Sequence, residues 1–411
     1  MTRNKKETSG EEIYRIASTV LAGGVSRASL WRNPVPGYAL KASGCHITDI
    51  EGVVRLDFAN NMTSLIHGHA RPEIIRNVTA QIRRGTAFHL ATEAEVRFAS
   101  HLCSRGGYDR VRFFNSGTEA VMALVRAARA FTGRRAVALA RGAYHGNYDI
   151  REPIAFPFND TARTLRILDR HASRIACVLI DPIPMRLEPE PATAGFIRSL
   201  ERWAHDNGAL FAFDEVVSFR NDYAGMAGHY QIKPDLVALG KIIGGGFPAG
   251  ALAGRVDIMA VFDARNGHPA LSFSGTFSAN PVTMTAGLTA MTLFDHQAVD
   301  RLNNLGDHAR KAGNEAARLA GVPVTLSGSG SLLRLSLNGT SPGHKPESRS
   351  ERVIRAITQY LYQHENLLAI HNGTFAFSTA MGIAEADHLA EALLNCFRVM
   401  KREIYLASRR H

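Results

Sequence analysis

The stretch "PDLVALGKIIGGGFPAG" (residues 234–250) combines an apolar run with the residues that set both the fold and the chemistry. The run ends at Gly240, Lys241 follows it, and three consecutive glycines begin at Gly244. A Walker A loop has the opposite order, with its glycines before the lysine and Ser or Thr after it. We therefore expect Lys241 to have a function other than holding nucleotide phosphates.

Short apolar runs alternate with helical patterns through the middle of the chain. Strong helix formers at 118–131 and an amphipathic stretch at 194–208, which ends in a glycine, predict helices. Continuous apolar strands separated by helices are typical of an α/β fold, in which helices cover both faces of a mostly parallel sheet. The predicted strands cover residues 110–115, 135–140, 175–181, 209–215 and 235–240.

After about residue 295 the pattern changes to that of a smaller α+β domain. Strands are predicted at 331–337 and 374–379, helices at 350–365 and 384–404, and a polar loop at 337–350. We expect three parts, which are an N-terminal segment (1–55), a large domain (56–295) and a C-terminal small domain (296–411).

Composition restricts the class of protein. The 411 residues are 45% hydrophobic and 21% charged, as in a folded protein with a large core. No apolar run could cross a membrane and the start lacks the apolar region of a signal peptide, so we expect a cytoplasmic protein without a membrane partner. The four cysteines form no C-x-x-C pair, so neither a metal site nor a disulfide framework is expected. The net charge of +11 is scattered and no nucleic-acid motif is present, which favours small anionic ligands over nucleic acid.

Ligands of open parallel sheets bind at the carboxyl ends of the strands, where four polar features of this sequence fall. The first is "NSGTEA" (115–120), whose bare glycine backbone, hydroxyl groups and helix-start amides suit an anion. An ordinary helix cap is the alternative. The second is "AYHGN" (143–147), in which Tyr144 could stack on a flat ligand or be a plain loop tyrosine.

The other two features are a carboxylate and an amine. Asp214 ends an apolar run and therefore needs a cationic or N–H partner, and a structural ion pair with Arg220 is the alternative to a functional role. Lys241 lies at the rim of the predicted sheet, where an amine can act as a nucleophile towards carbonyl groups. A solvated loop lysine is the alternative.

Together these four features match what pyridoxal 5′-phosphate (PLP) requires. The lysine would hold the aldehyde as a Schiff base, the carboxylate would keep the pyridine nitrogen protonated, and the helix start would bind the phosphate. The glycines after Lys241 would then give its side chain room to move between cofactor and substrate.

The sequence also resembles a known family, the class III aminotransferases of PLP fold type I. Within that family it is similar to glutamate-1-semialdehyde aminomutase and its relatives, which include β-amino-acid transaminases. The resemblance covers most of the chain, from about Val20 to about Thr379. It rests on the stretches "LAGGVSR", "RFFNSGTEAVMALVRAARAFTGR", "YHG", "FDEV", "LGKIIGGGFPAGALAGR" and "SGTFSANPVTMTAG".

The resemblance implies a role for each matching residue. Lys241 is expected to be the Schiff-base lysine, Asp214 to pair with the pyridine nitrogen, and Tyr144 and Val216 to lie on opposite faces of the ring. Thr276 is expected to reach the phosphate of the neighbouring subunit's cofactor, which implies a homodimer with shared active sites. The other cofactor-binding residues that the resemblance implies are Ser116, Gly117, Thr118 and His145.

Two departures from the family bear on function. The aminomutase has a long mobile loop after its "YHG" motif, whereas only about ten residues, "NYDIREPIAF", precede "PFND" here. Because an aminomutase must retain a diamine intermediate, the missing loop favours transamination. In addition, the strand that usually ends in Glu-Pro ends here in Asp181-Pro182, whose acid is one methylene shorter.

The substrate is expected to carry a carboxylate. By resemblance, Arg27 is the carboxylate-binding arginine, and a surface arginine is the alternative. Where β-amino-acid transaminases have a second arginine, this sequence has His371 and Asn372. A single cation suits a β- or γ-amino acid, whose amine is distal to its carboxylate.

Several functions compete. An aminotransferase that uses an amino donor and a keto acid or aldehyde acceptor leads, and an aminomutase or another PLP enzyme such as a racemase is second. A non-catalytic PLP-fold binding protein would not need Lys241 and Asp214. A dinucleotide-binding oxidoreductase would need a G-x-G-x-x-G motif, and "GSGSLL" (328–333) is incomplete and misplaced.

Overall fold

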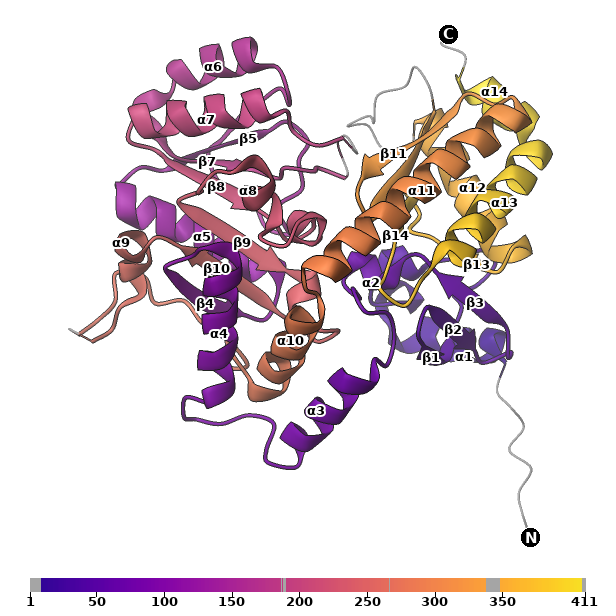
Figure 1. Cartoon of the computed structure of the whole chain (residues 1–411), viewed down its shortest axis with the longest axis horizontal. Helices are drawn as coiled ribbons and strands as arrows, with labels where there is room; N and C mark the ends of the chain where they lie inside the picture. The colour runs from indigo at the N-terminus through magenta and orange to yellow at the C-terminus, as the bar shows by residue number, and fades with distance from the viewer. Residues whose placement is uncertain (1–8, 186, 188–189, 266, 338–347, 409–411) are drawn as a thin grey trace. The chain divides into compact units, whose positions relative to one another are not determined.

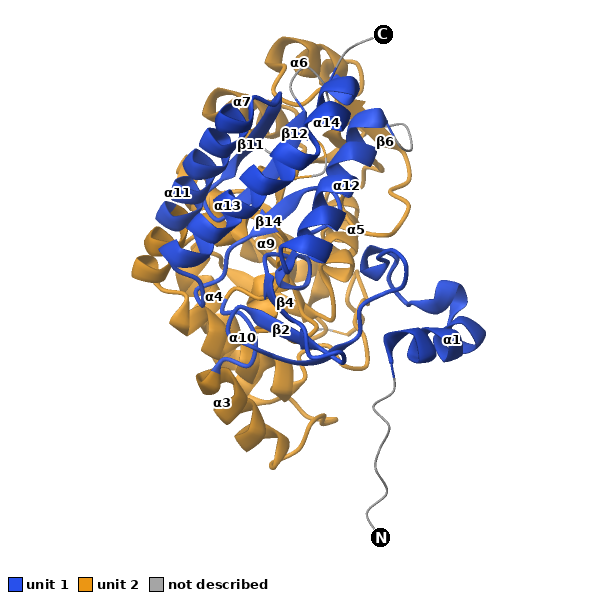
Figure 2. Cartoon of the chain, turned by 90° about the vertical axis from the view of Figure 1, so that its right-hand side faces the viewer, with its two compact units in different colours: residues 1–62, 67–71, 304–411 blue, residues 63–66, 72–303 orange. Residues whose placement is uncertain are grey.

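The computed structural model describes residues 9–185, 187, 190–265, 267–337 and 348–408. The chain forms two compact units, shown in blue and orange in Figure 2. Unit 1 comprises residues 1–62, 67–71 and 304–411, and unit 2 comprises residues 63–66 and 72–303. The three-part division expected from the sequence remains a prediction.

Unit 2 is built on a seven-stranded sheet (Figure 1). Its neighbouring strands pair in parallel, except that β10 runs antiparallel to both of its neighbours. All five strands predicted for this region are present, which confirms the mostly parallel sheet. In spatial order the strands are β4 (Arg110–Phe114), β10 (Gly250–Gly254), β9 (Leu236–Gly240), β8 (Leu210–Asp214), β7 (Ile175–Ile180), β5 (Ala136–Ala140) and β6 (Pro153–Phe156).

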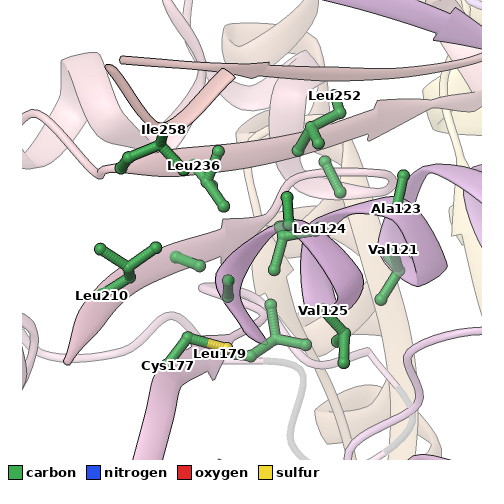
Figure 3. Close-up of a cluster of buried hydrophobic side chains, with 14 of the residues drawn as sticks. Val121, Ala123, Leu124, Val125, Cys177, Leu179, Leu210, Leu236, Leu252 and Ile258 are labelled. Atoms are coloured by element: carbon green, nitrogen blue, oxygen red, sulfur yellow. The ribbon is translucent and has the colours of Figure 1, made fainter. Parts of the chain in front are cut away.

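Helices cover both faces of this sheet. Helix α5 (Gly117–Thr132) packs one face, and Figure 3 shows Leu124 and Val125 of the helix against strand residues such as Leu236. Since neighbouring strand residues point to opposite faces, Leu210 and Ala212 of β8 belong to the α5 face, whereas Phe213 stacks edge-on against Tyr230 on the other face. Burial on both sides explains why the strands read as continuous apolar runs.

The remaining helices of unit 2 follow the predicted pattern of alternation. Helix α7 (Ala194–Asp206) ends as predicted, because Gly208 adopts a left-handed conformation (φ +62°) directly after it. The others are α3 (Pro72–Ile82), α4 (Glu93–Gly106), α6 (Thr161–Asp169), α8 (Gly225–Tyr230), α9 (Val256–Met259) and α10 (Pro281–Leu293).

Unit 1 contains two small sheets. One has the order β1 (Ala39–Ser43), β2 (His46–Asp49), β3 (Val54–Asp57) and β13 (Leu367–Leu368). The other is the antiparallel sheet β11 (Val324–Ser329), β12 (Leu332–Leu337) and β14 (Thr374–Ala376). Helices α1 (Gly10–Val20) and α12 (Arg349–His364) also belong to this unit, while the long α11 (His296–Ala320) and the short α2 (Asn60–Thr63) each have residues in both units.

One sequence prediction about this region was wrong. The single helix predicted over 384–404 is two helices, α13 (Ile383–Val399) and α14 (Lys401–Ser408), because the backbone at Met400 (φ −93°, ψ 14°) leaves the helical region. Most of the predicted polar loop, residues 338–347, lies outside the described residues.

Two further features of the described residues bear on the class of protein. Within those ranges, no helix has the length and apolar character that a membrane crossing requires. The thiols of all four cysteines are free.

Candidate active site

The start of α5 has the geometry of an anion site. Ser116 caps the helix, because its Oγ accepts the N–H of Glu119 at 3.2 Å. In return the Glu119 carboxylate accepts the N–H of Asn115 at 2.9 Å, so the turn is held at both ends. The hydroxyl of Ser116 can still donate its own hydrogen, and the first amides of a helix have no partner within the helix. These donors and the positive end of the helix dipole suit a phosphate group.

Bare glycine backbone brings this turn against the ends of the neighbouring strands. A Cβ atom on Gly117 would lie 2.7 Å from Cγ1 of Val216, and one on Gly240 would lie 3.2 Å from both Gly117 Cα and Val216 Cγ1. A Cβ on Gly250 would lie 2.0 Å from the carbonyl oxygen of Ser116. A Cβ would meet backbone at Gly250 and would crowd Val216 at Gly117 and Gly240, so glycine at these positions lets the start of α5, Val216 and the strand before Lys241 approach closely.

The loop after β5 joins the same cluster. The N–H of Asn147 donates to Oγ1 of Thr118 at 3.4 Å, and a Cβ on Gly146 (φ +102°) would lie 2.8 Å from that oxygen. The Tyr144 hydroxyl donates to Oδ1 of Asn147 at 2.9 Å, and Tyr144 is 36% exposed. The structure thus places the predicted aromatic residue beside the predicted phosphate turn.

Asp214 is only 5% exposed, and its charge has two partners. Oδ1 accepts the N–H of Val216 at 3.1 Å, and Oδ2 lies 2.8 Å from the ring Nδ1 of His145. These contacts supply the cationic or N–H partner that we expected for Asp214. A structural ion pair with Arg220 was the alternative to a functional role. Arg220 is fully buried and donates from Nη1 to the carbonyl of Thr63 at 3.3 Å. His145, expected to belong to the cofactor site, contacts the carboxylate of Asp214 from the loop after β5.

The adjacent acid, Glu215, has a structural task. Its carboxylate accepts the N–H groups of Met226 at 2.7 Å and Ala227 at 3.1 Å, in the first turn of α8. Burial raises the pKa of Glu215 to about 8, and these two amide donors oppose the rise. Of the two neighbouring acids, Asp214 is therefore the one turned towards the cluster.

Lys241 follows β9 in a strained backbone conformation. Its φ of +49° lies in the left-handed region, which costs a residue other than glycine on the order of 1–3 kcal/mol. Because Asp214 pairs with Ala238 across β8 and β9, Lys241 lies three residues beyond the level of Asp214 on the neighbouring strand. The glycines after it are also needed, since a Cβ on Gly245 (φ +59°) would lie 2.4 Å from the carbonyl oxygen of Ala286.

A third acid, Asp181, belongs to the cluster and was not assigned a role from the sequence. It follows β7, is buried, and accepts the N–H of Ile183 on Oδ1 at 2.9 Å. Burial first and the charge of Asp214 second raise the pKa of Asp181 to about 7, against the opposing effects of His145 and Lys241. The unusual Asp181-Pro182 at the end of an apolar run was the signal that could have identified it.

Two further site residues were predicted from the sequence. Thr276 is exposed, and its neighbour Gly275 adjoins the phosphate turn, because a Cβ there would lie 2.6 Å from Nδ2 of Asn115. Arg27 belongs to unit 1, where its Nη1 donates to Oδ1 of Asn61 at 2.8 Å.

The residues gathered in unit 2 fit PLP. An anion turn at Ser116 and Gly117, a buried carboxylate at Asp214, an accessible ring at Tyr144 and an amine at Lys241 are the groups that this cofactor needs. The bare backbone of Gly117 and Gly240 also permits a close approach. Among the described residues, no group of His, Cys, Asp and Glu could hold a metal ion.

Comparison with known proteins gives the same assignment. The family model "Aminotransferase class-III" matches residues 29–151 and 156–340. Glutamate-1-semialdehyde 2,1-aminomutase of Methanothermobacter thermautotrophicus is 36% identical over 358 residues, which are 80% of this chain and 84% of that protein.

Two solved structures are similar over nearly the whole chain. An omega-transaminase from Sphaerobacter thermophilus superposes with a TM-score of 0.91 and is 36% identical, with 96% of this chain and 98% of that chain covered. A beta-phenylalanine aminotransferase from Variovorax paradoxus has a TM-score of 0.88 and is 30% identical, with 95% and 94% covered.

A methyl group at position 117 tests the packing of the phosphate turn. Gly117→Ala should lower the stability of the cofactor-free protein by about 1–3 kcal/mol, because the new Cβ overpacks against Val216. Adding Val216→Ala should recover part of that loss, which unfolding of the wild type, both single variants and the double variant measures as a coupling energy.

Gly195→Ala in α7 is the matched control, since a Cβ there meets nothing within 4 Å and alanine favours a helix. If the effects of Gly117→Ala and Val216→Ala simply add, the two residues do not pack as described.

Proposed function

The chain belongs to the class III aminotransferases, whose cofactor is PLP, and we propose that it transfers an amino group between an amino acid and a keto acid or aldehyde. The proposed donor carries its amine distal to its carboxylate, as in a β- or γ-amino acid. The observation that carries the proposal is the meeting of Lys241, Asp214 and the α5 phosphate turn at one edge of one sheet. When bound there, PLP supplies an electron sink for the carbon that loses its proton.

Each residue of the cluster has a proposed task. The amine of Lys241 would hold the cofactor aldehyde and would move the proton at the reacting carbon. Asp214, held by His145 and the amide of Val216, keeps a proton on the pyridine nitrogen. Tyr144 and Val216 would lie on opposite faces of the cofactor ring. Ser116, Gly117 and Thr118 would bind its phosphate.

The connection after Tyr144 favours an aminotransferase over an aminomutase. Residues 147–152 run directly into β6, which pairs with β5 at the edge of the sheet. This short connection offers no long loop to close over the site and retain a diamine. The aminomutase remains the second candidate, because a relative with that name is 36% identical to this chain.

The half-reaction is the decisive experiment. The holoenzyme, mixed with a β- or γ-amino acid and no acceptor, should change the absorbance of its cofactor and release the corresponding keto acid or aldehyde. An aminomutase would instead convert glutamate-1-semialdehyde into its isomer without consuming an acceptor. A non-catalytic binding protein would hold PLP and show neither reaction.

Lys241→Ala should reduce turnover by at least about 10³-fold, since it removes both the amine that binds the aldehyde and the proton carrier. Borohydride should attach the cofactor covalently to residue 241 of the wild type, which peptide mass spectrometry detects. Lys233→Ala is the control, because Lys233 is an exposed lysine of the same unit that pairs with Asp109 at 3.4 Å. Normal turnover by Lys241→Ala would falsify the proposed function.

The carboxylate specificity rests on Arg27. The other candidate position, His371, offers no second cation, because burial and the neighbouring Arg32 lower the pKa of His371 to about 4. The imidazole is therefore neutral near pH 7 and contacts Nη1 of Arg32, whose Nη2 donates to the carbonyl of Ala369 at 2.9 Å. The exposed guanidinium of Arg27 suits a substrate with one carboxylate.

Arg27→Ala should raise KM for a β-amino acid roughly 10- to 100-fold, the value of a charged hydrogen bond of about 1.5–3 kcal/mol. It should barely change KM for an amine that has no carboxylate. Arg15→Ala, an exposed arginine on α1, is the control. Equal weakening of both kinds of donor, or a preference for carboxylate-free amines, argues against this role of Arg27.

We further propose that the enzyme is a homodimer in which Thr276 reaches the phosphate of the partner's cofactor. Thr276 and the 61% exposed Phe277 extend outward from unit 2. A surface cavity of about 620 Å³ in the same unit is lined by Phe88, the 82% exposed Leu90 and Leu288. Large exposed apolar side chains of this kind favour contact with a second copy.

Thr276→Ala should weaken PLP retention by about tenfold, the value of one hydrogen bond to a charged group. The neighbouring Ser274→Ala is the control, and equilibrium dialysis of cofactor from both variants gives the comparison. Sedimentation equilibrium should show a dimer for both. A fully active monomer would exclude a shared site.

A further inference from the structure

Asp181 is the buried acid of the cluster that the proposed reaction does not use. Strands β7 and β8 are parallel neighbours in which Cys177 pairs with Leu210 and Leu179 with Ala212. Two residues further along each strand, on the same face of the sheet, are Asp181 and Asp214. Because side chains alternate between faces, both carboxyl groups lie on the α5 face, at one level, on strands about 5 Å apart.

The two acids are held in the same way but not equally well. Each uses Oδ1 to accept the N–H two residues ahead, from Ile183 for Asp181 and from Val216 for Asp214. Asp214 has a further partner in His145. Two neighbouring buried carboxyls do not both ionise readily. Burial first and the charge of Asp214 second raise the pKa of Asp181.

His145 passes over this pair. The sheet order β8-β7-β5 means that a side chain from the loop after β5 must cross the end of β7 to reach Asp214 at the end of β8. Asp181 is the residue directly after β7. The other ring nitrogen of His145, Nε2, is buried and has no hydrogen-bond partner among the described residues. Asp181 therefore lies beside the contact between His145 and Asp214.

We propose that Asp181 is a positioning residue that acts through Asp214: it holds a proton in acidic solution, so that a single negative charge stands behind the ring nitrogen of the cofactor, and it releases that proton as pH rises. This inference rests on the proposed PLP function. Ionisation of Asp181 would add a second negative charge near Lys241 and the cofactor. That charge would stabilise the protonated form of the Schiff base between them. The charged and titratable groups around Asp181 are Asp214, Glu215, His145, Lys241 and Tyr230.

The first readout is the absorbance of the bound cofactor as a function of pH. The asparagine of Asp181→Asn cannot ionise. The spectral transition of this variant should therefore occur about 0.5–1 pH unit below that of the wild type, as expected for removing one nearby charge. Asp181→Ser keeps an acceptor for Ile183 without a carboxyl group and should show the same shift. Asp206→Asn, which removes an exposed acid at the end of α7, should not.

The second readout needs no cofactor. The pKa of Asp181 is raised by burial and by Asp214 from an ordinary value near 4 to about 7, so the folded state binds this proton more tightly than the unfolded state. The resulting stability is complete below about pH 4 and is lost as pH rises through about 7. In cofactor-free protein, the Tm of Asp181→Asn relative to the wild type should therefore increase by a few degrees between pH 5 and pH 8.

Three outcomes are distinct. A lower spectral transition in both Asp181 variants, together with the widening Tm difference, supports the inference. An unchanged spectral transition in variants that fold and carry PLP on Lys241 overturns it and leaves the aminotransferase proposal intact. If Asp181→Asn fails to fold, Asp181→Ser decides by the same two readouts. Absence of PLP from Lys241 in the wild type would contradict the proposed function itself.

Discussion

The close approach of the α5 turn to the ends of β9 and β10 is the contact on which the active-site arrangement depends. A Cβ atom would meet backbone at Gly250, and at Gly117 and Gly240 it would press against Val216. The same helix buries its apolar side against the sheet, so the phosphate turn is attached to the most buried part of unit 2. A site held by the core in this way keeps its donors in place before any ligand binds.

The second constraint is the cost of placing charge at this edge. Asp214, Asp181 and Glu215 are all buried within two neighbouring strand ends, and burial of an unpaired charge is costly. The chain meets that cost differently for each acid. A backbone amide and an imidazole hold Asp214, the first turn of α8 donates to Glu215, and burial raises the pKa values of both Glu215 and Asp181.

Local patterns predicted much of the fold but little of the network within the site. Buried parallel strands and strong helix formers are legible in a single sequence, whereas "GALAG" (250–254) has too little apolar bulk to predict β10. The pairing of His145 with Asp214 joins residues 69 positions apart across an intervening strand. No local pattern encodes such a contact, because it follows from strand order. The end of α13 at Met400 has no glycine or proline to mark it.

The backbone of Lys241 has a consequence for how this protein can be improved. Glycine would adopt a φ of +49° without strain, so the fold alone would be better served by glycine at this position. The lysine therefore costs conformational free energy at the position where its proposed role requires an amine. If Lys241 has that role, thermostability and turnover are opposed at one residue, and a search that optimises folding alone would select against catalysis there.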